Sequence, residues 1–122
     1  MCDLDHFKKI NDRYGHGSGD EVLAGVGAIL LDTLRSSDFA GRFGGEEFLI
    51  LLPATNAQAA YEVAEKIRFG ISEIKIPIVA NQISLSVGIA VFPDDAIDAD
   101  GLARSADRAL YATKSNGAIE AK

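Results

Sequence analysis

Two adjacent acidic residues, Glu46 and Glu47, follow the pair Gly44-Gly45 in this chain of 122 residues. The segments on both sides are rich in β-forming residues, so the glycines predict the turn of a β-hairpin. Two neighbouring carboxylates at such a tip repel each other unless a cation binds beside them. Glycines also let a ligand approach the backbone closely. Taken alone, the stretch is compatible with a cation-dependent site or with an ordinary turn that carries solvated acids.

The elements that precede this stretch follow from apolar spacing and turn residues. Residues 1–5 are predicted to be the end of a strand, and residues 6–14 a short helix, because apolar side chains recur there at helical spacing. Ser18 and Glu21 have the spacing of a capping box, which predicts Ser18 as the N-cap of a second helix. The apolar face of that helix extends to about residue 34.

The rest of the chain alternates between strand and helix signals. Asn56 can cap a helix, and Pro77 cannot continue one. Along residues 83–92, large apolar side chains alternate with Ser, Gly and Ala, which predicts a strand whose second face permits close packing. The predicted strands are 39–43, 46–52, 76–79 and 83–92, and the predicted helices run from Asn56 to residue 71 and from about residue 102 to 114, with Asn116-Gly117 as a stop. This order predicts a mixed α/β layer fold with one sheet.

Composition limits the classes of partner. The length suits one domain, and the net charge of −6 disfavours a nucleic-acid groove or an anionic membrane surface. It leaves a nucleotide possible, because a metal ion can supply positive charge locally. Cys2 is the single cysteine, and no apolar run is long enough to cross a bilayer. We expect a cytoplasmic location, either free or as the cytoplasmic part of a membrane-anchored sensor.

Six blocks of residues, in a fixed order, resemble one known family. They are residues 3–12, Gly15-His16 with Gly19-Asp20, 35–38, 44–48, 86–90 and 106–114. Together they resemble the GGDEF domain of diguanylate cyclases, in its Gly-Gly-Glu-Glu-Phe form. The resemblance implies a palm-like, ferredoxin-like α+β fold whose mostly antiparallel central sheet is flanked by helices. It also implies a reaction of bacterial second-messenger signalling, in which two GTP molecules condense to cyclic di-GMP and release pyrophosphate.

The positions of the acidic residues in the family motif imply metal-binding and catalytic roles for them. Asp3 and Glu46 resemble the principal metal ligands, assisted by Glu47 and the backbone of Leu4, and Glu46 and Glu47 are the implied catalytic residues. The implied cofactor is Mg²⁺ or Mn²⁺, two ions per GTP, which suits hard oxygen ligands. On its own, Asp3 would read as a solvated acid at the end of a strand.

The resemblance also implies a set of substrate-binding residues. The backbone of His6 and Phe7, with Lys8, opens a helix and can meet phosphate through N–H groups and the helix dipole. Asn11 and Asp20 match the positions that bind guanine, although Asp20 could equally favour the dipole of its own helix. The remaining implied contacts to GTP are Gly45 and Lys114.

A second site is implied by Arg35 and Asp38, which match an Arg-x-x-Asp pattern upstream of the hairpin. In the family this pattern binds the product, cyclic di-GMP, and inhibits the enzyme. Arginine offers a planar fork of donors to phosphate or guanine, and aspartate accepts from guanine N1 and N2. The alternative is a helix-terminal arginine beside a turn aspartate.

Two departures from the family pattern accompany the resemblance. We interpret residues 1–122 as one GGDEF domain that lacks the usual N-terminal helix and the start of the first strand, and Ala118 stands where the family has a phosphate-binding arginine. The alternative function is a weak or inactive module that binds GTP or cyclic di-GMP and signals by docking. For turnover, the resemblance implies a homodimer, driven together by an upstream sensory domain.

Overall fold

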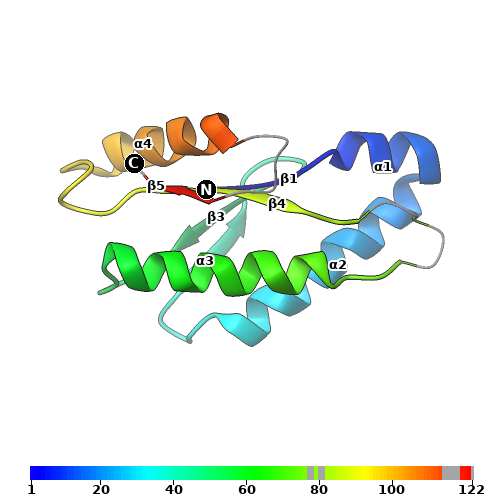
Figure 1. Ribbon diagram of the computed structural model, residues 1–122, viewed down its shortest axis with the longest axis horizontal. Helices are drawn as coiled ribbons and strands as arrows, with labels where there is room; N and C mark the ends of the chain where they lie inside the picture. The colour runs from blue at the N-terminus through cyan, green and yellow to red at the C-terminus, as the bar shows by residue number, and fades with distance from the viewer. Residues whose placement is uncertain (77–78, 80–81, 114–118, 122) are drawn as a thin grey trace.

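A five-stranded sheet runs through the centre of the fold, with helices on both faces (Figure 1). The computed structural model describes residues 1–76, 79, 82–113 and, for the backbone, 119–121. In chain order the elements are β1 (Cys2–Leu4), α1 (Phe7–Tyr14), α2 (His16–Thr33), β2 (Phe39–Arg42), β3 (Glu47–Leu51), α3 (Ala57–Ser72), β4 (Leu85–Ile89), α4 (Ala99–Thr113) and β5 (Ile119–Ala121).

β1 is the central strand, although it comes first in the sequence. The strand order is β2-β3-β1-β4-β5, and β1 is antiparallel to both of its neighbours. β2 and β3 form the predicted antiparallel hairpin, whereas β4 and β5 are parallel. The arrangement confirms the predicted ferredoxin-like, palm-like α+β fold with a mostly antiparallel sheet. β5 was not predicted, because three residues are too few to show an alternating pattern.

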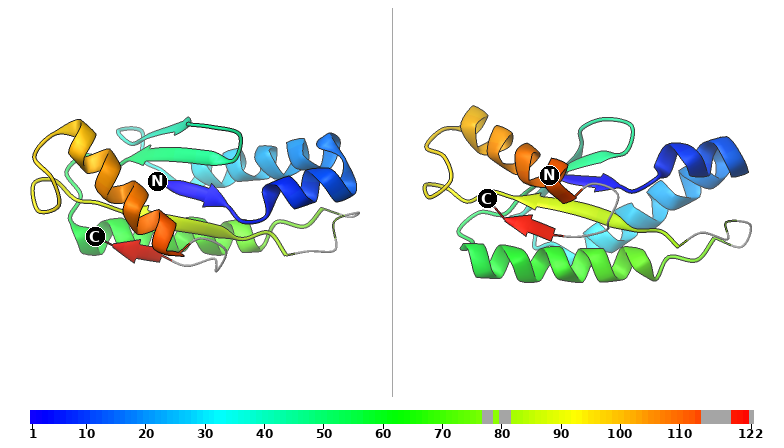
Figure 2. Two further views of the ribbon diagram at one scale, coloured as in Figure 1. Left: turned by 90° about the horizontal axis from the view of Figure 1, so that it is seen from above. Right: turned by 45° about the horizontal axis from the view of Figure 1, so that its top comes forward.

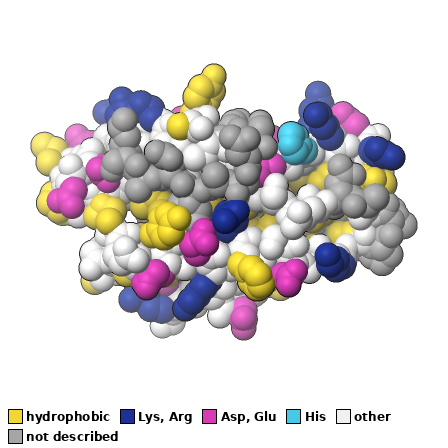
Figure 3. All heavy atoms as spheres, viewed as in Figure 1, with side chains coloured by type: hydrophobic (Ala, Val, Ile, Leu, Met, Phe, Trp, Pro, Cys, Tyr) yellow, Lys and Arg dark blue, Asp and Glu magenta, His cyan; other side chains and the backbone are white. Residues whose placement is uncertain are grey.

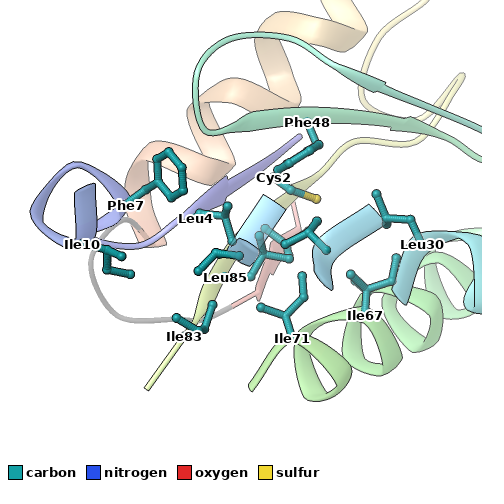
Figure 4. Close-up of a cluster of buried hydrophobic side chains, with 14 of the residues drawn as sticks. Cys2, Leu4, Phe7, Ile10, Leu30, Phe48, Ile67, Ile71, Ile83 and Leu85 are labelled. Atoms are coloured by element: carbon teal, nitrogen blue, oxygen red, sulfur yellow. The ribbon is translucent and has the colours of Figure 1, made fainter. Parts of the chain in front are cut away.

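The main hydrophobic core lies between the sheet and the helices α2 and α3, below the sheet in Figure 1. Figure 4 shows side chains of neighbouring strands, among them Leu4 and Leu85, directed towards Ile71 of α3. Each fully buried aliphatic side chain of this kind contributes about 1.5–3 kcal/mol to folding. Cys2 is buried in the same core, and this burial raises the pKa of its thiol.

The opposite face of the sheet is covered by α4, which crosses the strands as Figure 2 shows. Residues 84–90 present Ser, Gly and Ala on this side, as the sequence alternation predicted. A Cβ atom at Gly88 would overlap the backbone of Ala106 and Leu110, so only glycine lets α4 lie directly on β4. Met1 and Leu110 are buried in a small apolar cluster on this face.

The start of α2 differs from the prediction. Gly15, at φ 91°, is the N-cap, the helix begins at His16, and no side chain caps it. Ser18 therefore lies inside the first turn, where it is buried and its hydroxyl donates to the Tyr14 carbonyl at 3.3 Å. The capping-box prediction was wrong because Gly15, with its positive φ, ends α1 and is itself the N-cap of α2, three residues before Ser18.

Other boundaries agree more closely with the sequence. Asn56 is the predicted N-cap of α3, and its side chain accepts from the Ala59 N–H at 2.8 Å. The strand predicted over 83–92 is shorter, and the last helix begins earlier, at Ala99. Ile76 and Val79 lie in no strand, and the rest of that predicted segment and the Asn116-Gly117 stop fall outside the described residues.

Charged side chains of both signs are interspersed on the face shown in Figure 3, with apolar side chains among them. The excess of negative charge is therefore not gathered in one place on that face. Within the described part of the chain, no helix combines the length and the apolar character needed to span a bilayer.

Candidate functional site

The acidic residues predicted to act together come from two paired strands. Asp3 of β1 stands opposite Glu47 of β3, and the Leu4 N–H donates to the Glu46 carbonyl at 3.1 Å. Residues directly opposite in an antiparallel pair carry their side chains on the same face. Asp3 and Glu47 therefore share the α4 face of the sheet, and Glu46 lies immediately before the strand. Asp3 is buried, whereas Glu46 and Glu47 are half-buried.

The hairpin tip that carries these acids is held by Arg42. Its Nε donates to the Gly44 carbonyl at 3.1 Å and its Nη2 to the Gly45 carbonyl at 2.8 Å. Neither glycine has a positive φ. The turn between β2 and β3 therefore does not use the left-handed conformation that a Gly-Gly pair favours. A Cβ at Gly45 would meet nothing within 4 Å, which leaves open space beside the backbone for a ligand.

The first turn of α1 presents backbone N–H groups next to β1. His6 is its N-cap in the left-handed conformation, at φ 57° and ψ 25°, and no side chain caps the helix. Phe7 is buried, so only its backbone could meet a ligand, while Lys8 is exposed. An uncapped N-terminus leaves donors available for an anion, which is compatible with the predicted contact to phosphate.

Among the described residues, Asn11 carries a buried side-chain oxygen that lacks a hydrogen-bond partner. Its Oδ1 is buried and, among the residues that the structure describes, no hydrogen-bond donor reaches it. Gly19 of α2 packs against this atom so closely that a Cβ there would overlap it. Asp20 is exposed, one residue further along α2 and beyond its first turn, so the alternative role of favouring the helix dipole is weakened.

The oxygen atoms of Asp3, Glu46, Glu47 and the Leu4 carbonyl are donors of the type that Mg²⁺ takes in proteins. Their chemistry therefore fits a divalent cation at the junction of β1 and β3. Within residues 1–76, 79 and 82–113, no three acidic, histidine or cysteine side chains already stand close enough together to hold a metal. The predicted ligands are thus adjacent in the fold but not assembled into a closed cage.

Arg35 and Asp38 are also brought together, at the end of α2. Arg35 Nη2 lies 2.8 Å from Asp38 Oδ1, and the Arg35 N–H donates to Asp38 Oδ2 at 2.8 Å. The same Nη2 donates to the Pro53 carbonyl at 3.0 Å and to the Thr55 hydroxyl at 3.1 Å. The hydrogen bonds from Arg35 lower the pKa of Asp38 and raise that of the guanidinium. This pair is satisfied internally.

Three residues at the site were not singled out from the sequence. Arg42 holds the hairpin tip, Gly19 makes room for Asn11, and Asp5 is a buried acid between the residues predicted to bind metal and those predicted to bind phosphate. The signal for Gly19 was its place one residue before Asp20. Lys114, predicted to contact the triphosphate, and Ala118 lie outside the described residues.

Comparisons with known proteins converge on one family. The family model described as "Diguanylate cyclase, GGDEF domain" matches residues 1–119. Diguanylate cyclase A of Treponema denticola is 43% identical over 119 residues, which cover 96% of this chain and 32% of that protein. Diguanylate cyclase DgcP of Pseudomonas aeruginosa is 40% identical over 119 residues, 96% of this chain and 18% of that protein. The chain thus spans about a third or less of these curated relatives.

Solved structures agree with the sequence relatives. The active GGEEF domain of a diguanylate cyclase from Vibrio cholerae aligns with a TM-score of 0.88 and 36% identity, over 98% of this chain and 78% of that one. The GGDEF domain of DgcB from Caulobacter crescentus, in complex with c-di-GMP, gives 0.86 and 32%, over 98% and 74%.

Proposed function

The chain belongs to the GGDEF domain family of diguanylate cyclases, and we propose that it condenses two GTP molecules into cyclic di-GMP with release of pyrophosphate. The observation that carries the proposal is the pairing of β1 with β3, which places Asp3 opposite Glu47 and ties Leu4 to Glu46. These are the acids that the reaction requires, brought together from positions more than 40 residues apart in the sequence.

In this reaction, the 3′-hydroxyl of each GTP attacks the α-phosphorus of the other, and two P–O bonds form while two pyrophosphates leave. Divalent cations, in our proposal two Mg²⁺ or Mn²⁺ per GTP, would offset the charge of the triphosphate when bound. Asp3, Glu46, Glu47 and the Leu4 carbonyl would hold them, and Glu46 would also take the hydroxyl proton. The N–H groups at the start of α1, with Lys8, would bind phosphate oxygens.

The guanine base would bind between α1 and α2. Asn11 Oδ1 is a buried acceptor that no donor reaches among the described residues, and guanine supplies donors at N1 and N2. Asp20, exposed nearby on α2, can accept the second of these. Adenine presents neither N2 donors nor an O6 acceptor, so ATP would leave the protein groups unpaired. Selectivity for GTP over ATP is therefore expected.

The proposal extends to partners. Each domain would hold one GTP, so turnover needs two chains face to face, and an upstream sensory domain in the parent protein would control their approach. Arg35 and Asp38 are proposed to bind cyclic di-GMP as an inhibitor. The complex of the related DgcB domain with c-di-GMP supports recognition of this product within the family. A location in the cytoplasm, where GTP is available, is part of the same proposal.

The direct test is product formation. The chain is incubated with GTP and Mg²⁺ or Mn²⁺, and cyclic di-GMP is sought by chromatography, with reactions lacking metal or containing ATP as controls. Metal-dependent cyclic di-GMP supports the proposal. Binding of GTP without product under conditions that dimerise the chain would instead support the alternative of a docking module. Absence of both binding and product would overturn the assignment.

A further inference from the structure

A buried carboxylate lies directly between the proposed metal-binding and phosphate-binding residues. Asp5 follows β1 and precedes the left-handed His6, and it is 8% exposed. Among the residues that the structure describes, no ion pair involves Asp5. Two hydroxyl groups of β4 and its neighbour satisfy it instead, because Ser84 donates to Oδ2 at 2.8 Å and Ser86 to Oδ1 at 2.7 Å. A charge buried in this way is costly unless it is fully hydrogen-bonded.

The second of these hydroxyls also contacts α4. Ser86 Oγ lies 3.1 Å from the carbonyl oxygen of Thr113, the last residue of that helix. Ser86 is 0% exposed, and Thr113 is 4% exposed. The end of a helix leaves carbonyl oxygens without partners inside the helix, and Ser86 reaches one of them. One side chain thus connects Asp5, β4 and the C-terminal end of α4.

The turn that follows Asp5 needs such an anchor. His6 has φ 57°, a conformation that costs a non-glycine residue about 1–2 kcal/mol and persists only where the surroundings impose it. The Asp5 N–H also donates to the Ser84 carbonyl at 3.0 Å, so both the backbone and the carboxylate of Asp5 are fixed to the same segment. The direction in which α1 leaves β1 is therefore set at Asp5.

We propose that Asp5 is a positioning residue of the triphosphate site. Through Ser84 and Ser86 it holds the β1–α1 turn against β4 and α4, and so fixes the N–H groups that open α1 relative to Asp3 and Leu4. Asp5 itself touches no phosphate. This inference rests on the proposed function, because it assumes that the first turn of α1 binds the phosphates of GTP.

The number of protons and acceptors around Ser86 allows two roles of Asp5 to be separated: its hydrogen bonds to the serine hydroxyls and its negative charge. Ser86 has one hydroxyl proton and two acceptors, Asp5 Oδ1 and the Thr113 carbonyl. An asparagine amide at position 5 could donate to Ser86 Oγ, which would free that proton for Thr113, while its carbonyl accepts from Ser84. Asp5→Asn therefore keeps the network, whereas Asp5→Ala removes it.

The first experiment measures affinity by calorimetry with Mg²⁺ present. The ligands are GMP and a GTP analogue with a methylene bridge between the α and β phosphorus atoms, which cannot be cyclised. We expect Asp5→Ala to weaken the analogue about tenfold or more, equivalent to about 1.4 kcal/mol. We expect it to leave GMP within about twofold, and Asp5→Asn to stay within about threefold for both. A purely structural loss would weaken both ligands alike. Asp32→Ala, the removal of an exposed acid on α2, is the matched control.

The second experiment needs no nucleotide. Hydrogen exchange on the free chain should show the amides of residues 6–10 exchanging about tenfold faster in Asp5→Ala than in the parent, with α3 unchanged. If Asp5→Ala fails to fold, Ser84→Ala removes one hydroxyl from the partly exposed side of the network and should give a smaller change in the same amides.

The two experiments distinguish the possible failures. If the parent binds no GTP analogue, the proposed function fails, and only hydrogen exchange then tests whether Asp5 fixes the β1–α1 turn. Unchanged exchange at residues 6–10 in Asp5→Ala would overturn that role. Faster exchange with undiminished analogue affinity overturns the link to the triphosphate site. An Asp5→Asn variant as impaired as Asp5→Ala would show that charge, not the hydroxyl network, is what matters.

Discussion

Two polar regions of the molecule are proposed to bind guanine nucleotides. They differ in whether their polar groups already have hydrogen-bond partners within the protein. Around Asn11 a buried acceptor has no donor among the described residues, and the start of α1 carries no side-chain cap. At the end of α2, Arg35 and Asp38 satisfy each other, and Arg35 also bonds to Pro53 and Thr55. The first region lacks bonds that a ligand can supply, whereas the second already has them.

The difference teaches how each site should respond to its ligand. A buried acceptor without a donor costs about 1–3 kcal/mol, and a nucleotide that supplies the donor recovers that cost. A ligand at Arg35 and Asp38 must instead exchange existing bonds for new ones, so its net gain is smaller. GTP should therefore bind without breaking hydrogen bonds within the protein. Cyclic di-GMP should bind only after existing hydrogen bonds of Arg35 and Asp38 are exchanged.

The largest effect should come from the acids beside the first region. We expect Glu46→Gln to reduce turnover by about 100-fold or more, because losing even an outer partner of a metal ligand costs 10–100-fold. Cyclic di-GMP affinity should not change, since Arg35 and Asp38 are untouched. Product formation and calorimetry measure the two effects. Glu62→Gln, an exposed acid on α3, is the control, and parental turnover in Glu46→Gln would refute the assignment.

Gly19→Ala tests whether Asn11 Oδ1 accepts a hydrogen bond from guanine. The added Cβ would overlap Asn11 Oδ1 and displace it, so we expect GTP affinity to fall about tenfold and the preference over ATP to shrink. Gly17→Ala is the matched control, because a Cβ there meets nothing within 4 Å and should stabilise α2 by up to about 1 kcal/mol. Equal GTP affinity in both variants, or equal parental affinity for GTP and ATP, would contradict the guanine assignment.

Arg35→Ala addresses the second region. We expect cyclic di-GMP binding to weaken about tenfold or more, since a hydrogen bond to a charged group contributes about 1.5–3 kcal/mol, and GTP binding to remain nearly unchanged. Calorimetry on the two proteins measures both affinities. Arg108→Ala removes an exposed arginine of α4 and serves as the control. Equal cyclic di-GMP affinity with and without Arg35 would rule out this site.

The smallest effect concerns pH. Hydrogen bonds from Arg35 hold the pKa of Asp38 below its ordinary value of 3.8. The pair therefore stabilises the fold above that value, and this contribution is lost as the pH falls through the lower pKa of the folded state. The free energy of unfolding should differ more between parent and Asp38→Asn at about pH 6 than at about pH 3. A difference between parent and Asp38→Asn that does not change with pH would argue against the pair.

Local patterns were sufficient for much of the fold. The hairpin around Gly44-Gly45, the cap at Asn56 and the strand with a small-residue face were all visible, because each depends on residues close together in sequence. Ser18 was misassigned because a capping motif competes with a left-handed glycine nearby, and only the backbone conformation decides between them.

The candidate site was predicted less completely. The acids were predicted through their motif, but the sequence could not show that β1 pairs with β3 or that Arg42 bonds to the tip of the turn. Contacts across the sheet join residues with no local relation. Ser86 and Asp5 are 81 residues apart, and nothing in either neighbourhood indicates the other.

The same separation has a consequence for how the chain folds during synthesis. β1 precedes both of its neighbours in the sheet, β3 and β4, and contacts of such high sequence separation form slowly. At about 5–20 residues per second, roughly 4–16 seconds pass between translation of Asp5 and of its partner Ser86. Until β4 is made, β1 can pair only with β3. The central strand is thus synthesised before both of its neighbours and completes its pairing only after β4 has been made.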